Sequence, residues 1–204
     1  MPEAAVLAQP AVLRRTMTYE AFIQDASFNH HEWVNGEVIA MGEISLEHNK
    51  ITGFLFRLVA SFLDQGGAGQ IFYEPWNMKL KSGLPGRCPD LTVVLRKHED
   101  RLRDKYLDGA ADVVVEVVSP SSVVTDHQTK FSEYEAGGVP EYWLIDPDQG
   151  TAEFYHLDDR GRYQPMAIDG GIFRSRELPG FWLRVAWLWD RPLVREAEAE
   201  LGLR

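Results

Sequence analysis

Short apolar runs bounded by turn residues predict a buried β-sheet in the second half of the chain. The most strand-like run covers residues 113–118, where valines surround a single glutamate and Ser-Pro follows. Residues 91–95 form a second apolar run, and residues 141–146 form a third that Asp-Pro ends. An uninterrupted apolar run is typical of a strand covered on both faces. We therefore expect residues 113–118 to form a central strand.

Apolar positions at helical spacing predict a long helix over residues 46–64 and another over residues 123–136. A pair of glycines follows each of them, as is common at helix ends. The second helix lies between two predicted strands. The resulting strand–helix–strand unit is long enough for a crossover between parallel strands.

Turn residues predict β-hairpins outside this unit. Asn35-Gly36 separates two apolar-rich runs, and a type I′ turn needs positive φ at both of its central residues. A second hairpin is expected around residues 158–161, and residues 70–80 read as one strand bent at Pro75. The pattern favours an α+β fold of the α/β type. It would have a mixed central sheet flanked by helices, with extra N-terminal and C-terminal hairpins.

Length and charge narrow the class of protein. The chain has 204 residues, enough for a single domain, which we place at residues 17–204 after a flexible tail at residues 1–16. A net charge of −10 argues against a generally basic nucleic-acid binder. The single cysteine, Cys88, allows no intrachain disulfide, and no apolar run approaches the ~20 residues of a membrane span. We expect a cytoplasmic protein.

Two acids accompany the predicted central strands. Glu116 lies inside one apolar run and Asp90 directly precedes another. If the strands are neighbours, about 4.8 Å apart, two half-buried carboxylates would repel one another unless a cation lies between them. Mg²⁺ takes oxygen ligands and is often held by one or two carboxylates. Lys130, on the helix after the Glu116 strand, could then offset charge developing on a phosphate.

Simpler interpretations of these residues stay open. Asp90 could cap a turn, and Glu116 could be buried by an ion pair with Lys130 alone. Cys88 is best explained as a small buried apolar residue rather than a nucleophile. His48 could be a surface residue in the first turns of its helix or could lie at the rim of a site, and the histidine spacing fits no zinc finger.

Several motifs, taken together, resemble the Uma2 family, a branch of the PD-(D/E)XK restriction-endonuclease-like superfamily. The resemblance covers about residues 17–190. Its motifs are Arg87-Cys-Pro-Asp90-Leu, Val115-Glu116-Val-Val-Ser-Pro-Ser, Asp126, Lys130 and Tyr134, residues 138–147, Asn35-Gly36-Glu37, His48, and Leu178-Pro-Gly180.

The resemblance implies a restriction-endonuclease-like fold and a metal-dependent endonuclease acting on DNA. It implies that Asp90 and Glu116 bind Mg²⁺ or Mn²⁺. The superfamily has a lysine two residues after the second acid, but Val118 stands there. The resemblance implies that Lys130, on the following helix, takes over the role of this lysine. Gln128 is a weaker candidate for the same role. Glu37 resembles the additional N-terminal acid of such nucleases, and His48 is a further candidate.

Two other functions compete with a nuclease. The fold could persist in a non-catalytic homologue that acts as a dimeric partner-binding module, for which the Trp-rich residues 181–189 would suit an interface. A homodimer is expected in either case. A glycosidase would also use two acids, but it gives no role to Lys130.

Overall fold

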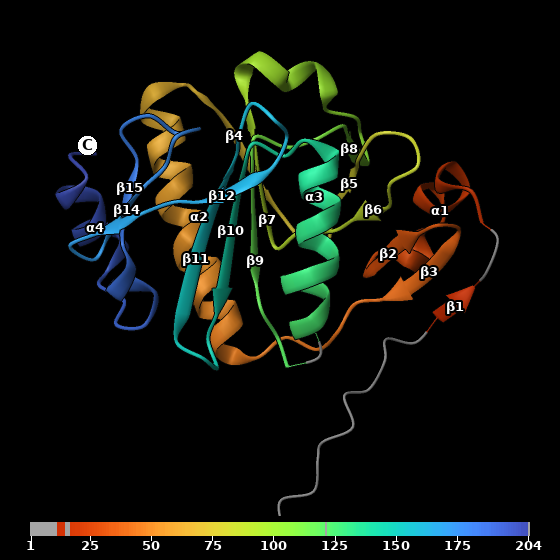
Figure 1. Ribbon diagram of the computed structural model, residues 1–204, viewed down its shortest axis with the longest axis horizontal. Coiled ribbons are helices and arrows are strands. Elements are labelled where there is room, and N and C mark those ends of the chain that lie inside the picture. Colours follow the sequence, from red (N-terminus) through yellow and green to blue (C-terminus); the bar gives the residue numbers. More distant parts are fainter. Residues whose placement is uncertain (1–11, 15–16, 121, 204) are drawn as a thin grey trace, which may run out of the picture.

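A mixed six-stranded sheet forms the centre of the protein, with helices on both of its faces (Figure 1). The computed structural model describes residues 12–14, 17–120 and 122–203. Strands β9 (Val113–Val117) and β10 (Glu141–Asp146) are parallel, whereas the other neighbouring strands of this sheet are antiparallel. In spatial order the strands are β12 (Tyr163–Pro165), β11 (Thr151–Leu157), β10 (Glu141–Asp146), β9 (Val113–Val117), β7 (Leu91–Leu95) and β4 (Gly69–Tyr73).

The two predicted long helices cover opposite faces of this sheet. Helix α2 (Leu46–Gly66) begins where the Ser45 side chain accepts a hydrogen bond from the backbone N–H of His48, at 3.1 Å. The crossover from β9 to β10 runs through a π-helical segment, Thr125–Lys130, that continues into α3 (Phe131–Gly137). The crossover helix is confirmed, but the π-helical turn was not expected from the sequence. Segments of this kind recur at functional sites.

The two-residue repeat of a strand decides which side chains of β9 face each helix. Val113, Val115 and Val117 join the core under α2, whereas Val114 joins the core that contains Tyr134 of α3. Glu116 shares the parity of Val114, so its side chain lies on the α3 face.

A second six-stranded sheet carries the N-terminal hairpin. Asn35 and Gly36 have φ values of 51° and 92°, which confirms the predicted turn between β2 (His31–Val34) and β3 (Glu37–Ala40). The strands in spatial order are β1 (Val12–Arg14), β3 (Glu37–Ala40), β2 (His31–Val34), β6 (Gly86–Arg87), β5 (Asn77–Lys79) and β8 (Tyr106–Asp108).

The remaining elements are short. Three strands make a small third sheet, and two helices lie near the ends of the chain: β13 (Ile168–Asp169), β14 (Ile172–Arg174), β15 (Trp182–Arg184), α1 (Tyr19–Gln24) and α4 (Val194–Glu200). Three 3₁₀ turns complete the description: Ala26–Phe28, Arg96–Arg101 and Val185–Leu188.

The prediction of one bent strand over residues 70–80 is wrong. Strand β4 belongs to the central sheet and β5 to the N-terminal sheet, with Glu74, Pro75 and Trp76 connecting them. The chain therefore changes sheets at Pro75, which cannot donate to a ladder.

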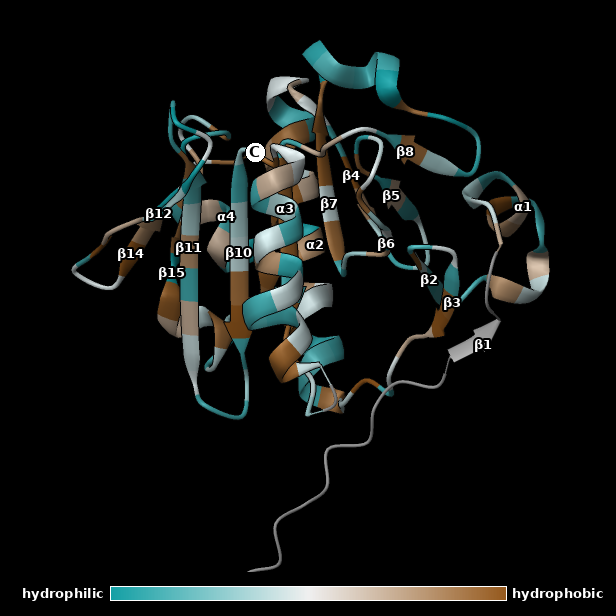
Figure 2. Cartoon of the chain, turned by 45° about the vertical axis from the view of Figure 1, so that its right-hand side comes forward, coloured by the Kyte–Doolittle hydropathy of each residue, from teal (hydrophilic) through white to brown (hydrophobic). Residues whose placement is uncertain are grey.

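The charged run after β7 lies away from the packed core. Arg96–Arg101 forms a 3₁₀ turn, teal in Figure 2, without any buried residue. It follows the C-terminal end of β7, whereas Asp90 precedes the N-terminal end. A strand of this length spans about 17 Å, so this run and Asp90 lie at opposite ends of β7.

The predicted flexible tail, residues 1–16, lies outside the described residues except for Val12–Arg14, which pair with β3 as strand β1. Across the described ranges, none of the helices has the length and apolar character needed to cross a membrane.

Candidate active site

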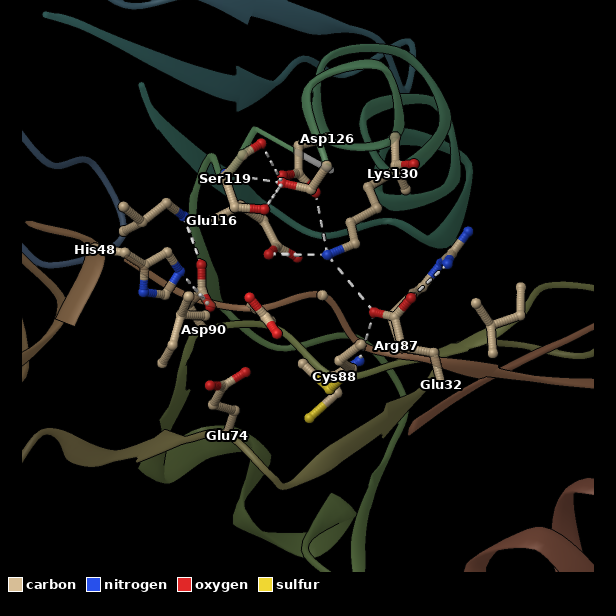
Figure 3. A pocket seen from close by; sticks show the side chains of 18 of the residues that line it. Glu32, His48, Glu74, Arg87, Cys88, Asp90, Glu116, Ser119, Asp126 and Lys130 are labelled. Atoms are coloured by element: carbon tan, nitrogen blue, oxygen red, sulfur yellow. Dashed lines mark hydrogen bonds and ion pairs between the residues drawn. The ribbon is translucent and has the colours of Figure 1, made fainter. Parts of the chain in front are cut away.

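Asp90 and Glu116 lie next to each other where two interior strands of the central sheet meet, before the first residue of β7 and near the last residue of β9 (Figure 3). The antiparallel register pairs Leu91 with Val115, and the next step of the same register places Asp90 beside Glu116. Residues directly opposite one another in an antiparallel pair share a face. Asp90 is fixed there because its Oδ2 accepts a hydrogen bond from the Val117 N–H at 2.6 Å. Both carboxylates are buried, with 5 % and 3 % of their surface exposed.

Lys130 reaches these acids from the crossover helix. Its Nζ lies 3.0 Å from Glu116 Oε2, 3.1 Å from Asp126 Oδ1 and 3.5 Å from Glu32 Oε1. Figure 3 shows the ammonium group between carboxylates that come from three different elements. The structure therefore brings together Asp90, Glu116 and Lys130, as the sequence predicts.

Burial dominates the electrostatics of Glu116. Loss of solvation raises its pKa well above the usual value, Lys130 opposes this rise, and the negative charges of Asp126 and Asp90 add to it. For Lys130, burial lowers the pKa, but Asp126, Glu116 and Glu32 outweigh that effect and hold it well above the usual value. The lysine is therefore charged at neutral pH and cannot act as a general base there.

Tyr134 fixes the orientation of Glu116. Its hydroxyl donates a 2.6 Å hydrogen bond to Glu116 Oε1, leaving Oε2 for Lys130. Burial raises the pKa of Tyr134 well above its usual value, so the phenol remains a donor. The hydrogen bond favours the ionised form of Glu116.

His48 belongs to the site rather than to the surface. It is 3 % exposed, and its Nε2 lies 3.1 Å from Asp90 Oδ1. Burial lowers the pKa of His48, but the hydrogen bond and charge of Asp90 raise it by more. Its other ring nitrogen, Nδ1, is buried without a hydrogen-bond partner in the part of the chain that is described.

Two of the predicted residues lie outside the cavity that holds this group. Glu37 begins β3 beside the hairpin turn, and Gln128 is exposed on the crossover helix. The acid that the N-terminal hairpin brings to the site is Glu32, in the middle of β2. The available signal in the sequence was an acid within the first run of the predicted hairpin, directly before Trp33 and Val34.

Glu32 connects the site to a buried arginine. Glu32 Oε2 lies 2.6 Å from Arg87 Nη1, and Oε1 accepts the Cys88 N–H at 3.2 Å. The other guanidinium nitrogens of Arg87 donate to both oxygens of Glu133 on α3, at 2.7 and 2.8 Å. Burial raises the pKa of Glu32, but Lys130 and Arg87 outweigh it, so the net shift is downward.

Glu74 is a further acid that the sequence did not single out. It lines the same cavity, and its pKa is raised by burial and by the charge of Asp90. Cys88 lines the cavity too, but it is 1 % exposed and burial raises the pKa of its thiol well above the usual value. This confirms that Cys88 is a buried apolar residue rather than an activated nucleophile.

These residues line a cavity of about 880 Å³. Six of its lining residues are acidic. The lining also contains one arginine, Arg87, and one lysine, Lys130. Both of these cations are already paired with carboxylates. The cavity therefore carries an excess of negative charge, as a site for a divalent cation requires. The acidic lining residues are Glu32, Glu43, Glu74, Asp90, Glu116 and Asp126.

Comparisons with known proteins point to a nuclease family. A model of the Uma2 family, described as "Putative restriction endonuclease", matches residues 18–186. An uncharacterized protein of Synechocystis is 30% identical over 132 residues, which cover 64% of this chain and 68% of that protein. A crystal structure from Anabaena variabilis, described as "a putative nuclease belonging to DUF820", is similar with a TM-score of 0.69. That likeness covers 85% of this chain and 98% of the other at 18% identity, so it shows the shared fold.

Proposed function

This chain belongs to the Uma2 family, and on that premise we propose that it is a divalent-cation-dependent endonuclease that hydrolyses DNA phosphodiester bonds. One observation carries the proposal. Asp90 and Glu116 line one cavity from neighbouring strands, and the Nζ of Lys130 lies 3.0 Å from Glu116. A carboxylate pair with an adjacent fixed cation suits phosphoryl chemistry, in which negative charge must be bound and stabilised.

The donor set fits Mg²⁺ or Mn²⁺. Across the described ranges, no group of three or more His, Cys, Asp or Glu side chains is arranged to hold a metal. Mg²⁺ needs fewer protein ligands, because it usually keeps several waters and takes one or two carboxylates. We assign Asp90 and Glu116 as those carboxylates. When bound, the cation would polarise a phosphoryl oxygen and acidify a water.

The other residues hold this pair in place and balance its charge. His48 holds Oδ1 of Asp90, while the Val117 N–H holds Oδ2. Lys130 remains protonated, so its role is to stabilise negative charge on the phosphate or to orient a water. Asp126 and Glu32 keep its ammonium group at the cavity wall.

The alternative of a partner-binding module has less support. It relied on the Trp-rich residues 181–189, but Phe181, Leu183 and Trp187 are buried in the core of the domain. A homodimer and a cytoplasmic location stay predictions. Analytical ultracentrifugation of the full chain would test the first, and fractionation of the source cells the second.

Cleavage and metal binding test the proposal separately. Labelled single- and double-stranded DNA should be cut by the wild type with Mn²⁺ or Mg²⁺, but not by Asp90→Asn or Glu116→Gln. Calorimetry should show that these two variants lose metal binding as well. Lys130→Met should keep metal binding yet lose ~100-fold or more in cleavage rate, the scale of removing one electrostatic group.

Lys81→Met is the matched control, because Lys81 is an exposed loop lysine that does not line the cavity. It should cut DNA at the wild-type rate. Cleavage that survives both Glu116→Gln and Lys130→Met would overturn the assignment of the site. Equal metal binding by the wild type and Asp90→Asn would overturn the metal site.

A further inference from the structure

One wall of the active-site cavity is apolar and comes from the N-terminal hairpin. The register of the hairpin pairs Glu32 with Ile39, and residues opposite one another in an antiparallel pair share a face. Glu32 reaches Lys130 from this face (Figure 3), so Ile39 also points toward the cavity, which it lines. Val34 follows Glu32 by the two-residue repeat of a strand and lines the cavity too. The hairpin therefore places apolar side chains beside the lysine of the site.

The apolar wall takes no part in the hydrophobic core. Val34, Ile39, Met41 and Ile44 line the cavity. Within the described part of the chain, none of them packs into the two cores of the central sheet or into the small cluster that surrounds Val38. Val38, on the other face of the hairpin, is fully buried, whereas Ile44 keeps 42 % of its surface exposed. The wall is therefore open to a ligand.

The cavity has room for more than a phosphate and a cation. Its volume of about 880 Å³ lies in the upper part of the roughly 300–1,000 Å³ of small-ligand pockets. Asp90, Glu116 and Lys130 are at most 7 % exposed, so a phosphate must enter the cavity to reach them. The nucleoside attached to that phosphate enters with it.

An unpaired nucleobase matches the apolar wall in shape and polarity. Enzymes that act on an extruded or single-stranded nucleotide hold its base between aromatic or apolar side chains. Such packing tolerates any base, because every base has a flat face of low polarity. Met41 adds a flexible side chain that can adapt to bases of different size.

The charge of the cavity disfavours a DNA duplex. Affinity for duplex DNA comes largely from Lys and Arg contacts to phosphates. Arg87 and Lys130 are the lysine and arginine in the cavity lining, and both are paired with buried carboxylates. The charged run Arg96–Arg101 lies at the other end of β7. Packing of a base on the apolar wall needs no free cation, but it needs a base that is not already stacked and paired.

We propose that the apolar wall formed by Val34, Ile39, Met41 and Ile44 binds the base of an unpaired nucleotide whose phosphate lies at Asp90 and Glu116. The substrate class is single-stranded or locally unpaired DNA. This inference rests on the proposed nuclease function, because that function places the phosphate.

The test compares two strands of equal charge. A short single strand of deoxyadenylate and an abasic strand of the same length are titrated at low salt into Glu116→Gln, without divalent metal, so that neither is cleaved. We expect the deoxyadenylate strand to bind at least about tenfold more tightly, the scale of one stacked base. A duplex of the same sequence should bind no better than the abasic strand.

Two substitutions remove the accessible part of the apolar wall. Met41→Gln and Ile44→Asn, added together to Glu116→Gln, should lower the preference for the deoxyadenylate strand to about twofold or less. Ile44→Asn alone should lower it about threefold, which keeps the test valid if Met41→Gln folds poorly. Neither side chain belongs to a core, so the melting temperature should stay that of Glu116→Gln.

Ile168→Asn is the matched control. Ile168 is 40 % exposed, almost as much as Ile44, but it belongs to β13 and does not line the cavity. Added to Glu116→Gln, it should keep the full preference for the deoxyadenylate strand.

The outcomes separate this inference from the proposed function. Equal binding of the two strands, no binding of either, or a preference that the Met41 and Ile44 substitutions leave intact would overturn the base site, while metal-dependent cleavage could stand. Tighter binding of the duplex than of the single strand would overturn the substrate class. A preference that these substitutions remove would support the base site even if no cleavage is found, in which case only the nuclease assignment fails.

Discussion

Replacing Glu116 by glutamine should make the metal-free protein more stable. Removing one member of a buried ion pair usually destabilises a protein by about 3–5 kcal/mol, because the other charge is left alone. Lys130 would not be left alone, since Asp126 lies 3.1 Å and Glu32 3.5 Å from its Nζ. What Glu116→Gln removes is a buried negative charge whose pKa is raised chiefly by burial.

Hydrogen bonding sets the size of the effect. A glutamine oxygen can accept from Tyr134 or from Lys130, so the variant loses roughly one hydrogen bond, worth ~1 kcal/mol. Each tenfold by which the fold disfavours the ionised carboxylate costs about 1.4 kcal/mol at neutral pH. The free energy gained by removing the buried charge exceeds the free energy lost with the hydrogen bond once the fold disfavours the ionised carboxylate by more than about tenfold. We expect a net gain of ~1–2 kcal/mol, or roughly 2–8 °C in melting temperature for a domain of this size.

The pH dependence gives this prediction its sign. The pKa of folded Glu116 lies above that of the unfolded chain, so the unfolded state releases its proton first as the pH rises. Wild-type stability from this group is therefore lost as the pH rises from about 4.5 toward the folded pKa, and Glu116→Gln does not lose it. The gain should be small at pH 4 and should grow as the pH rises toward 8.

Thermal unfolding in a metal chelator, scanned from pH 4 to pH 8, measures the difference. Added Mg²⁺ should then stabilise the wild type and leave Glu116→Gln unchanged. A variant that is less stable than the wild type at pH 8 without metal would refute the reasoning, because the ion pair with Lys130 would then outweigh the burial of charge.

Other changes follow from the same contacts. Glu32→Gln should act in the opposite direction, because the net pKa shift of Glu32 is downward; urea unfolding should show a loss of about 2–4 kcal/mol at pH 7 that shrinks as the pH falls below ~4.5. Tyr134→Phe removes the 2.6 Å hydrogen bond to Glu116, and calorimetry should show Mg²⁺ binding weakened ~10-fold or more. Gly69→Ala should lower the melting temperature, since a Cβ there would lie 2.4 Å from the Val94 carbonyl oxygen. Gly53→Ala meets nothing within 4 Å and should raise the free energy of unfolding by the ~0.5–1 kcal/mol of a helical glycine replaced by alanine.

The local sequence pattern was enough to predict that Asp90 and Glu116 lie close together. Both adjoin or interrupt runs that can only be buried strands, and the two-residue repeat then decides their shared face. Lys130 follows from the crossover, because the helix after a central strand must return over the sheet. The resemblance to Uma2 supplied the role of each residue, which periodicity alone does not.

The missed acids depend on contacts between distant segments. Glu32 and Glu37 are both in the N-terminal hairpin, and only the pairing of β2 with β6 decides that Glu32 reaches Arg87 and Lys130. Glu74 was hidden in a run that read as one strand, because nothing local indicates that the chain changes sheets at Pro75. Tertiary pairing overrides local pattern at both places.

The π-helical segment Thr125–Lys130 limits which insertions and deletions the protein can tolerate. A lysine on a strand keeps its face as long as the pairing holds, but a helical residue changes direction with each residue inserted or deleted before it, by about 100° in an α-helix. Deleting one residue between Ser122 and Lys130 would turn the ammonium group away from Glu116 even if every side chain of the site were retained. Lineages that carry the lysine on this helix should therefore accept substitutions in the segment far more readily than changes in its length.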